Sequence, residues 1–365
     1  MTRTNRPAPV QPRPRRRVHA TLRTLGWGVG LSAIVGTLAL SRLQVVSAAD
    51  APPAKGVAGA VAVPAGVPAV VDPRNMYSEV GAGKFSPVLR DDLTRIYVPN
   101  LRSNDVYVVD PALMKVVDRF KVGISPQHIV PSWDLRTLWV TNNAEGRTDG
   151  SLTPIDPRTG KPGVAIPVDD PYNMYYTPDG KSAIVVAEAR KRLDFRDPQT
   201  MALQYSIDTP GCPGINHADF SIDGRFAVFT CEFSGSLAKV DLANRSVAGY
   251  LQLAMPATRF KESKSAPRAV AGKVWEPGET EVCSVERGMP QDIRSSPDGQ
   301  RLYVADMHAD GVHVIDAAAF KKIGFIPTGI GAHGLYPSRD GKSLYVANRG
   351  SHKIHGPNAV TAASR

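Results

Sequence analysis

Cysteine is scarce in this sequence. Only Cys212, Cys231 and Cys283 occur among 365 residues, a number that suits an exported protein with one disulfide and one remaining thiol. There is no CxxC pair, and the eight histidines form no HxxxH or HExxH motif. A Gly-x-Ser-x-Gly turn and a Ser/His/Asp order are missing as well. These absences predict that the chain holds no metal and no cofactor.

Acidic residues are absent from the first 49 residues, which contain eight arginines. The uncharged run from Leu25 to Leu40 has 16 residues, which is short for a membrane-spanning helix. The segment Val46-Ser47-Ala48-Ala49 offers a small-residue cleavage site. We therefore predict a signal peptide over residues 1–49 and an extracytoplasmic location: periplasm, cell surface or secreted. The alternative is an uncleaved signal that anchors the chain, and this is the only membrane contact we predict.

The basic charge of the chain comes mostly from this N-terminal segment. Without its eight arginines, the 44 basic residues fall to 36 against 34 acidic ones, a net charge of +2 instead of +10. No basic stripe with interleaved aromatic residues remains, so the sequence argues against nucleic-acid binding. With 42% hydrophobic and 21% charged residues, the composition is that of a globular protein.

One segment, from Met289 to Gly329, gives the clearest view of how the chain is built. A short extended run ends at Ser296-Pro297-Asp298-Gly299, whose residue types favour a tight turn. Three further β-branched or aromatic runs follow and are separated by polar loops. About forty residues therefore predict a four-stranded antiparallel sheet.

The same unit recurs through residues 85–348. Its second strand occurs six times, with a step of 42 residues between Tyr97 and Trp139 and again between Tyr303 and Tyr345. This spacing is typical of propeller blades. We predict equivalent positions for six residues: Tyr97, Trp139, Val185, Val228, Tyr303 and Tyr345.

The Tyr-Val-Ala/Thr-Asn strand, the Ser-Pro-Asp-Gly turn and the Val-x-Val-Ile-Asp strand resemble the YVTN-repeat β-propeller family of exported bacterial and archaeal proteins. The family is related in blade pattern to lactonase-like and surface-layer propellers. The resemblance covers about residues 85–348 and implies an all-β propeller of four-stranded antiparallel blades. It implies no single function, because such propellers include binding scaffolds, hydrolases and redox enzymes.

Several segments depart from the repeat. Residues 50–84 are rich in Ala, Pro and Gly and predict a flexible linker, and residues 255–288 form an inserted loop. Five units read as complete, whereas the sixth stops after two strands and residues 349–365 form an irregular tail. We therefore predict an open gap or a strained ring, with exposed strand edges that favour self-association.

Polar residues recur where the inner strand of each unit begins. Strand order places these residues at one mouth of a central channel, together with residues that follow the second strands. The candidate ligand-binding residues are Gln127, His128, Asn173, Asn216, His217, Glu188, Glu232, Gln291, Asp292 and His333. They predict either a polar ligand site or a set of hydrogen bonds to the backbone at the blade junctions.

Two pairs of residues are predicted to meet. Asp219 and Arg294 occupy the same register in neighbouring units and suit an ion pair across a blade boundary. Cys212 precedes the first strand of its unit and Cys231 follows the second, so antiparallel pairing should bring them together as a disulfide. Cys283 is the competing partner for either.

These features predict an exported, noncatalytic binding or scaffold protein at the cell envelope. Its partner would be a small molecule or another envelope protein, bound at the channel mouth. The alternative is a periplasmic lactonase-like hydrolase or redox enzyme that uses the same face, with or without a metal. The sequence does not decide whether the chain is an enzyme.

Overall fold

The computed structural model describes residues 61–256, 287–338 and 340–352. The predicted signal peptide, the tail after residue 352, Cys283 and most of the predicted inserted loop lie outside these residues. The described chain is almost entirely β-strand, with two short 3-10 helices, η2 (Ser78–Val80) and η3 (Pro87–Leu89). None of its helices is long and apolar enough to cross a membrane.

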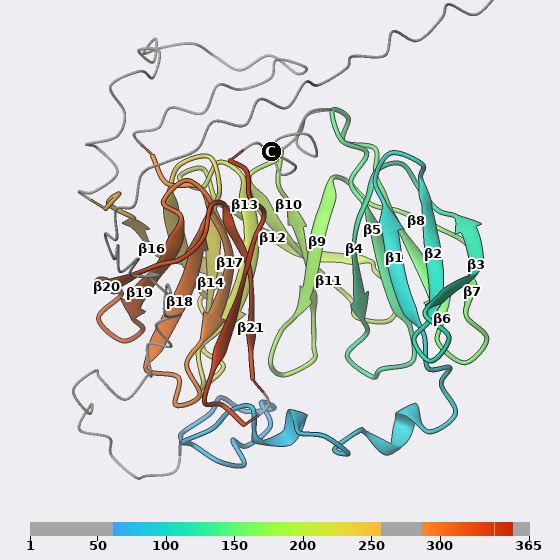
Figure 1. The fold of residues 1–365 in the computed structure, drawn as a ribbon, viewed down its shortest axis with the longest axis horizontal. Helices are drawn as coiled ribbons and strands as arrows, with labels where there is room; N and C mark the ends of the chain where they lie inside the picture. Colours follow the sequence, from blue (N-terminus) through green and yellow to red (C-terminus); the bar gives the residue numbers. More distant parts are fainter. Residues whose placement is uncertain (1–60, 257–286, 339, 353–365) are drawn as a thin grey trace, which may run out of the picture. The chain divides into compact units, whose positions relative to one another are not determined.

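Six antiparallel sheets follow one another along the chain, and we number them blades 1 to 6 (Figure 1). Their strands are β1 (Ile96–Asn100), β2 (Asp105–Asp110) and β3 (Lys115–Lys121) in blade 1; β4 (Pro126–Pro131), β5 (Leu138–Asn142), β6 (Ser151–Asp156), β7 (Lys161–Pro162) and β8 (Ile166–Pro167) in blade 2; β9 (Pro171–Tyr176), β10 (Ala183–Ala187), β11 (Arg192–Arg196) and β12 (Leu203–Asp208) in blade 3; β13 (Ile215–Phe220), β14 (Phe226–Cys231), β15 (Ser236–Asp241) and β16 (Ser246–Gln252) in blade 4; β17 (Pro290–Ser295), β18 (Arg301–Asp306), β19 (Gly311–Asp316) and β20 (Lys321–Pro327) in blade 5; and β21 (Ala332–Pro337) and β22 (Leu344–Asn348) in blade 6. The predicted β-propeller with an incomplete sixth unit is confirmed.

Blade 1 corrects one detail of that prediction. Its first strand, β1, contains Tyr97, which lies in the second strand of the repeat, and no strand of the described residues pairs with β1 on its inner side. The first unit is therefore not complete. Among the described residues before Ile96, residues 61–95 carry several prolines and glycines and form turns and short 3-10 helices rather than an inner strand.

The turn between the first two strands of a blade is fixed by side-chain hydrogen bonds. In blade 5, Ser296 Oγ donates to Asp298 Oδ1 over 2.6 Å and accepts the Arg301 N–H over 2.9 Å. Gly299 takes a φ of +68°, which a residue with a side chain adopts only with strain. We call the end of the blades that carries these turns the turn end, and the opposite end the mouth end.

Apolar side chains between successive blades form the core. Trp139 of blade 2 packs with Met174 and Val185 of blade 3, and Ile184 of blade 3 packs with Phe229 of blade 4. The predicted equivalence of Val185 with Trp139 is therefore wrong by one residue, and Ile184 takes that place. The strand Ala183–Ala187 is buried throughout, so it lacks the polar alternation that would have fixed its register in the sequence.

The outer faces of the first and last blades remain uncovered. Hydrophobic clusters join each blade to the next, and among the described residues none joins blade 6 to blade 1. Tyr336 and Tyr345 form a cross-strand pair on blade 6 and are 60% and 63% exposed. On blade 1, Ile96 and Val98 are 49% and 39% exposed.

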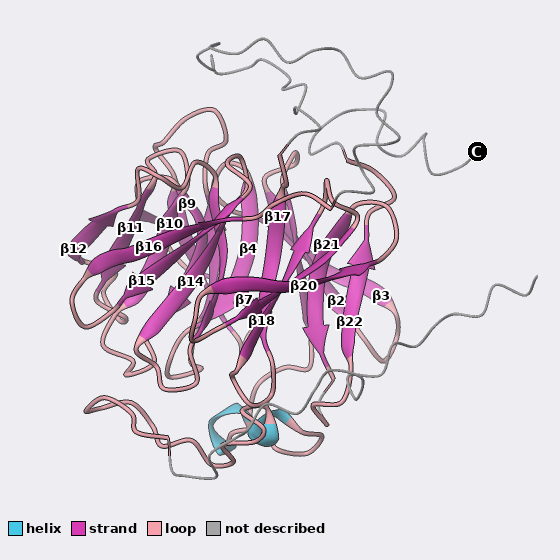
Figure 2. Ribbon diagram, turned by 90° about the vertical axis from the view of Figure 1, so that its left-hand side faces the viewer, coloured by secondary structure: helices cyan, strands magenta, loops and turns pink. Residues whose placement is uncertain are grey.

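Residues 61–95, which we call the strap, lie along the turn end of the blades, where Figures 1 and 2 place the short helices. The Met76 N–H donates to Pro297 O over 2.8 Å, and Tyr77 Oη donates to Ser295 O over 2.8 Å. Further along, the Leu93 N–H donates to Pro157 O in blade 2 over 2.9 Å. The strap thus links the turn ends of blades 5 and 2.

Candidate functional site

Each inner strand carries a β-bulge at the mouth end, where the candidate residues lie. In β4, Pro126 pairs with Asn142 and His128 with Thr141, so Gln127 is left without a cross-strand partner. The same irregularity falls at Tyr172 in β9, Asn216–His217 in β13, Gln291–Asp292 in β17 and His333 in β21. Bulges redirect side chains and locally bend a strand, so these positions share a backbone cause.

Two threonines tie the bulges to the neighbouring blades. Thr141 Oγ1 accepts the His128 N–H over 3.1 Å and donates to Tyr172 O in blade 3 over 2.9 Å. Thr230 does the same in blade 4: it accepts the His217 N–H over 3.0 Å and donates to Gln291 O in blade 5 over 2.8 Å. We did not predict these residues, although the threonine of the second-strand motif was the available signal.

His128, Tyr172 and His217 come together from blades 2, 3 and 4. The ring centroids of His128 and His217 lie 5.2 Å apart and meet edge to face. The Tyr172 ring lies 5.2 Å from His128 and 6.4 Å from His217. Three successive blades therefore contribute one aromatic group to a common cluster, which we call the ring cluster.

The hydrogen bonds of His217 fix its protonation. Its Nδ1 lies 3.2 Å from Asn173 Nδ2 and 3.4 Å from Tyr175 Oη. The Asn173 amide is oriented because its Oδ1 accepts the Met174 N–H, and Tyr175 Oη already accepts the Ala218 N–H. The Asn173 NH₂ group can only donate, so His217 Nδ1 carries the lone pair and Nε2 the proton. Tyr175 Oη also accepts an N–H of Asn173 over 3.0 Å, and its own proton is left to donate to Nδ1. Tyr175 was not predicted; it lies two residues after Asn173 on the same strand face.

His128 has the opposite arrangement. Its Nδ1 lies 2.9 Å from the carbonyl oxygen of Tyr172, which can only accept, so Nδ1 carries the proton and Nε2 the lone pair. Burial lowers the pKa of His128, and it lowers the pKa of His217 further with the help of repulsion from His128, Arg294 and His333. Both rings are thus neutral at pH 7.

Carboxylates form a second group at the mouth end. Asn216 Nδ2 donates to Glu232 Oε2 over 2.8 Å, and both side chains are buried. Burial, with repulsion from Glu232, Asp170 and Glu145, raises the pKa of Glu188 well above its usual value. Burial also raises the pKa of Tyr172, and the charges of Glu232 and Glu188 add to that effect. Asp170 was missed by the sequence reading because it precedes the inner strand.

Asp292 and Arg294 form a third group with a structural role. Arg294 Nη1 lies 2.8 Å from Asp292 Oδ1, while Asp292 Oδ2 accepts the Leu335 N–H of blade 6 over 2.9 Å. Asp219 makes a backbone contact instead of the predicted ion pair with Arg294: its Oδ2 accepts the Ser295 N–H of blade 5 over 2.6 Å. Burial raises the pKa of both aspartates and Arg294 opposes this. For Asp292 the backbone-bonding alternative therefore describes the observed contacts.

The remaining candidates are less closely joined to these groups. Gln291 Nε2 lies 3.4 Å from the carbonyl of Met289, which directly precedes β17, and Gln127 occupies its bulge outside the ring cluster. Burial, with repulsion from Arg349 and His128, lowers the pKa of His333 to about 4. Within the part of the chain that the structure describes, no group of three His, Cys, Asp or Glu side chains could hold a metal ion.

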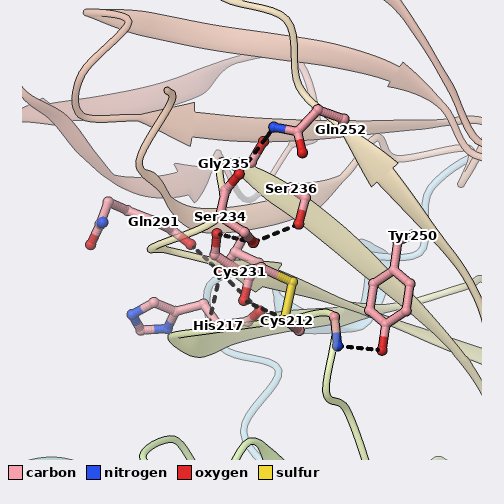
Figure 3. The surroundings of a disulfide bond; sticks show 11 residues. Cys212, His217, Cys231, Ser234, Gly235, Ser236, Tyr250, Gln252 and Gln291 are labelled. Carbon is pink, nitrogen blue, oxygen red and sulfur yellow. Dashed lines mark hydrogen bonds between the residues drawn. A yellow bond between two sulfur atoms is a disulfide. The ribbon is translucent and has the colours of Figure 1, made fainter. Parts of the chain in front are cut away.

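A disulfide joins Cys212 and Cys231, the pair predicted from the sequence, with their Cα atoms 4.8 Å apart (Figure 3). Both residues are fully buried. Cys231 pairs with Ile215 across β13 and β14, so the disulfide lies beside the bulge that carries Asn216 and His217. It therefore fastens the backbone next to the ring cluster.

No model of a known protein family matches this chain, and no curated protein matches it. Three similar solved structures are a functionally unknown protein from Desulfotomaculum acetoxidans (13% identity, TM-score 0.51, covering 69% of this chain and 72% of that chain), the periplasmic gluconolactonase PpgL of Pseudomonas aeruginosa (19%, 0.49, 67% and 70%) and hydrazine synthase of Kuenenia stuttgartiensis (20%, 0.45, 71% and 90%). Identities this low speak only to fold. The six successive antiparallel sheets, each joined to the next by a hydrophobic cluster, make the chain a β-propeller.

Proposed function

We propose that this chain is an exported propeller of the YVTN-repeat type that binds a small molecule or an envelope partner at its mouth end without transforming it. The arginine-rich, apolar and small-residue order of residues 1–49 supports export. The repeat motifs support the family. Under this proposal the blades act as a rigid frame, and the side chains at the bulges make the contacts.

The convergence of His128, Tyr172 and His217 carries the proposal. A purely structural role would satisfy each polar side chain within its own blade junction, as Asp292 is satisfied. His128 and His217 are not satisfied in this way. Hydrogen bonds to the protein involve only the Nδ1 atom of each ring and leave Nε2 without one. Rings that meet from three blades and keep unengaged polar atoms are an arrangement that suits recognition.

The second candidate is a hydrolase of lactonase-like type at the same place. The unprotonated Nε2 of His128 favours it, because a neutral imidazole can take a proton from an attacking water. Redox chemistry or a metal would need groups beyond those that the ring cluster contains. The binding role therefore remains the main proposal.

The binding role can be tested by affinity capture. A small-molecule extract of the cell envelope is passed over the immobilised full-length protein, and the retained compounds are identified. We expect the protein to retain a compound, and we expect Tyr172→Ala and His217→Phe to retain much less of it. Trp133→Ala, an exposed ring at the turn end, is the matched control and should retain as much as the wild type. Equal retention by all four proteins, or no retained compound, would contradict binding at the mouth.

The wild type, Trp133→Ala and one further variant, His128→Gln, separate the two candidates. A panel of lactones incubated with the wild type should remain unhydrolysed above the buffer rate if the role is noncatalytic. Turnover that disappears in His128→Gln and survives in Trp133→Ala would replace the binding role with the hydrolase.

A further inference from the structure

The two histidines of the ring cluster present opposite hydrogen-bonding groups. His128 has a lone pair on Nε2, because its Nδ1 proton is directed at Tyr172 O, 2.9 Å away. His217 has a proton on Nε2, because Asn173 Nδ2 and Tyr175 Oη both face its Nδ1 as donors. The rings are 5.2 Å apart. The ring that carries the acceptor and the ring that carries the donor are therefore neighbours at the mouth end.

Both Nε2 atoms are open to a ligand. His313 Nδ1 is an example of a side-chain nitrogen that is buried without a hydrogen-bond partner. His128 Nε2 and His217 Nε2 do not belong to that group of buried atoms. No hydrogen bond of the described residues involves either atom, and both side chains are only partly buried. The two nitrogens therefore still have hydrogen-bonding capacity to offer.

We infer that the mouth receives a neutral hydroxyl group, held by donation to His128 Nε2 and acceptance from His217 Nε2–H, on a polyol or sugar whose C–H face lies against Tyr172. The inference rests on the proposed binding function and names its ligand class. A hydroxyl group both donates and accepts, so it satisfies the two nitrogens together. The Tyr172 ring, 5.2 Å and 6.4 Å from the two imidazoles, supplies the adjoining apolar surface.

Ions fit this pair less well. An ammonium group can only donate, so it would leave the His217 Nε2–H facing it as a second donor. A carboxylate or phosphate can only accept, so it would meet the lone pair of His128 Nε2 as a second acceptor.

Imidazole ¹⁵N NMR on the full-length protein tests the two histidine tautomers on which the inference depends. At pH 7 the spectra should show a protonated Nδ1 in His128 and a protonated Nε2 in His217. Sorbitol and methyl glucoside should shift both Nε2 signals, whereas choline and acetate at the same concentrations should not. Two rings with the same tautomer, or no shift with either polyol up to its solubility limit, would overturn the inference.

Variants give a second readout. His217→Phe removes the donor and keeps an aromatic ring, so the dissociation constant for the polyol should rise roughly five- to tenfold, the effect of one neutral hydrogen bond. His308→Phe is the matched control, because His308 Nδ1 also faces a backbone carbonyl, 3.2 Å away at Arg287, outside the ring cluster. It should leave the dissociation constant unchanged.

The outcomes distinguish this inference from the proposed function. Shifts at the mouth caused by choline or acetate and not by polyols would overturn the hydroxyl inference and leave the binding role standing. The inference would also be overturned if polyols shifted the His128 Nε2 signal with the same affinity in the wild type and in His217→Phe. Retention of an extract compound, decided separately, tests the binding role itself.

Discussion

Asp170 is almost wholly buried beside Asp169 at the mouth end of blade 3. Its backbone has a φ of +49°, a conformation that asparagine also tolerates. Burial raises its pKa to about 6, and hydrogen bonds from the backbone of Arg190 and Ala189 only partly offset this. The ionised carboxylate is therefore less favourable in the folded chain than in the unfolded one.

Asp170→Asn should stabilise the protein above pH 6, because the unfavourable charge is removed. A carboxyl whose pKa rises on folding costs stability when it is ionised, and this cost disappears as the pH falls through 6 towards 3.8. We expect a gain on the order of 2 kcal/mol at pH 8 and none at pH 4. Urea unfolding at both pH values measures it. Asp169→Asn, which breaks ion pairs with Arg190 and Arg192, should give no gain at pH 8. A gain that does not change with pH would contradict the prediction.

Arg294 pairs with the buried Asp292, and its charge also acts on the half-buried Asp219. Arg294→Met should lower the free energy of unfolding by about 3 kcal/mol at pH 8, because Asp292 would stay buried without its ion-pair partner and Asp219 would lose the nearby positive charge. The loss should shrink in acid as the carboxyls gain protons. Arg190→Met is the control: it breaks an exposed pair with Asp169 and should cost less than about 1 kcal/mol. Equal losses would show that Arg294 has no special role.

Among the elements, the β13–β14 hairpin is closed by the disulfide. The two cysteines are 19 residues apart in sequence, and a loop of that length corresponds to about 3 kcal/mol. Cys212→Ser, Cys231→Ser and the double variant should all lose this amount, measured by urea unfolding without reductant. Dithiothreitol should bring the wild type down to the same value. A single variant that remains as stable as the wild type would contradict the assignment.

The strands themselves were largely visible in the sequence, because turn residues separate alternating runs. Register failed only in the uniformly buried strand of Val185, where both faces read alike. The fourth strand of blade 2 is broken into β7 and β8, which end at Pro162 and Pro167, residues without a backbone N–H to donate. Strand counting from the repeat alone missed this break.

The candidate site was predictable only in part, for reasons of geometry. Counting back from the turns located His128, Asn173 and His217 because bulges recur at the same register in every inner strand. The meeting of His128 with Tyr172 depends on how adjacent blades rotate against each other, and no sequence spacing encodes this. The tautomers depend on Tyr175 and on a backbone carbonyl, which become known only in three dimensions.

For the whole molecule, the uncovered faces of the end blades predict self-association. Tyr345 occupies a position whose counterparts Trp139, Ile184 and Tyr303 each pack against the following blade, yet it is 63% exposed. We expect sedimentation velocity to show oligomers that grow with concentration, through blade 6 of one copy and blade 1 of the next. Tyr336→Lys combined with Tyr345→Lys should reduce them.

The control for this prediction is Val164→Lys, a change at an 88% exposed residue of blade 2. It should leave self-association unchanged. A wild-type protein that stays monomeric at all concentrations, or oligomers indifferent to the blade 6 variant, would contradict the prediction.

The strap has a consequence for the order in which the molecule is completed. Tyr77 Oη reaches Ser295 O across 218 residues of sequence. During synthesis from the N-terminus, the strap therefore leaves the ribosome long before blade 5 exists. The Leu93 end of the strap can bond to Pro157 as soon as blade 2 exists, but the part around Tyr77 must wait undocked until blade 5 has formed. Attachment of that part thus belongs to the last stage of assembly, and until then the newly made chain exposes the turn end of blade 5.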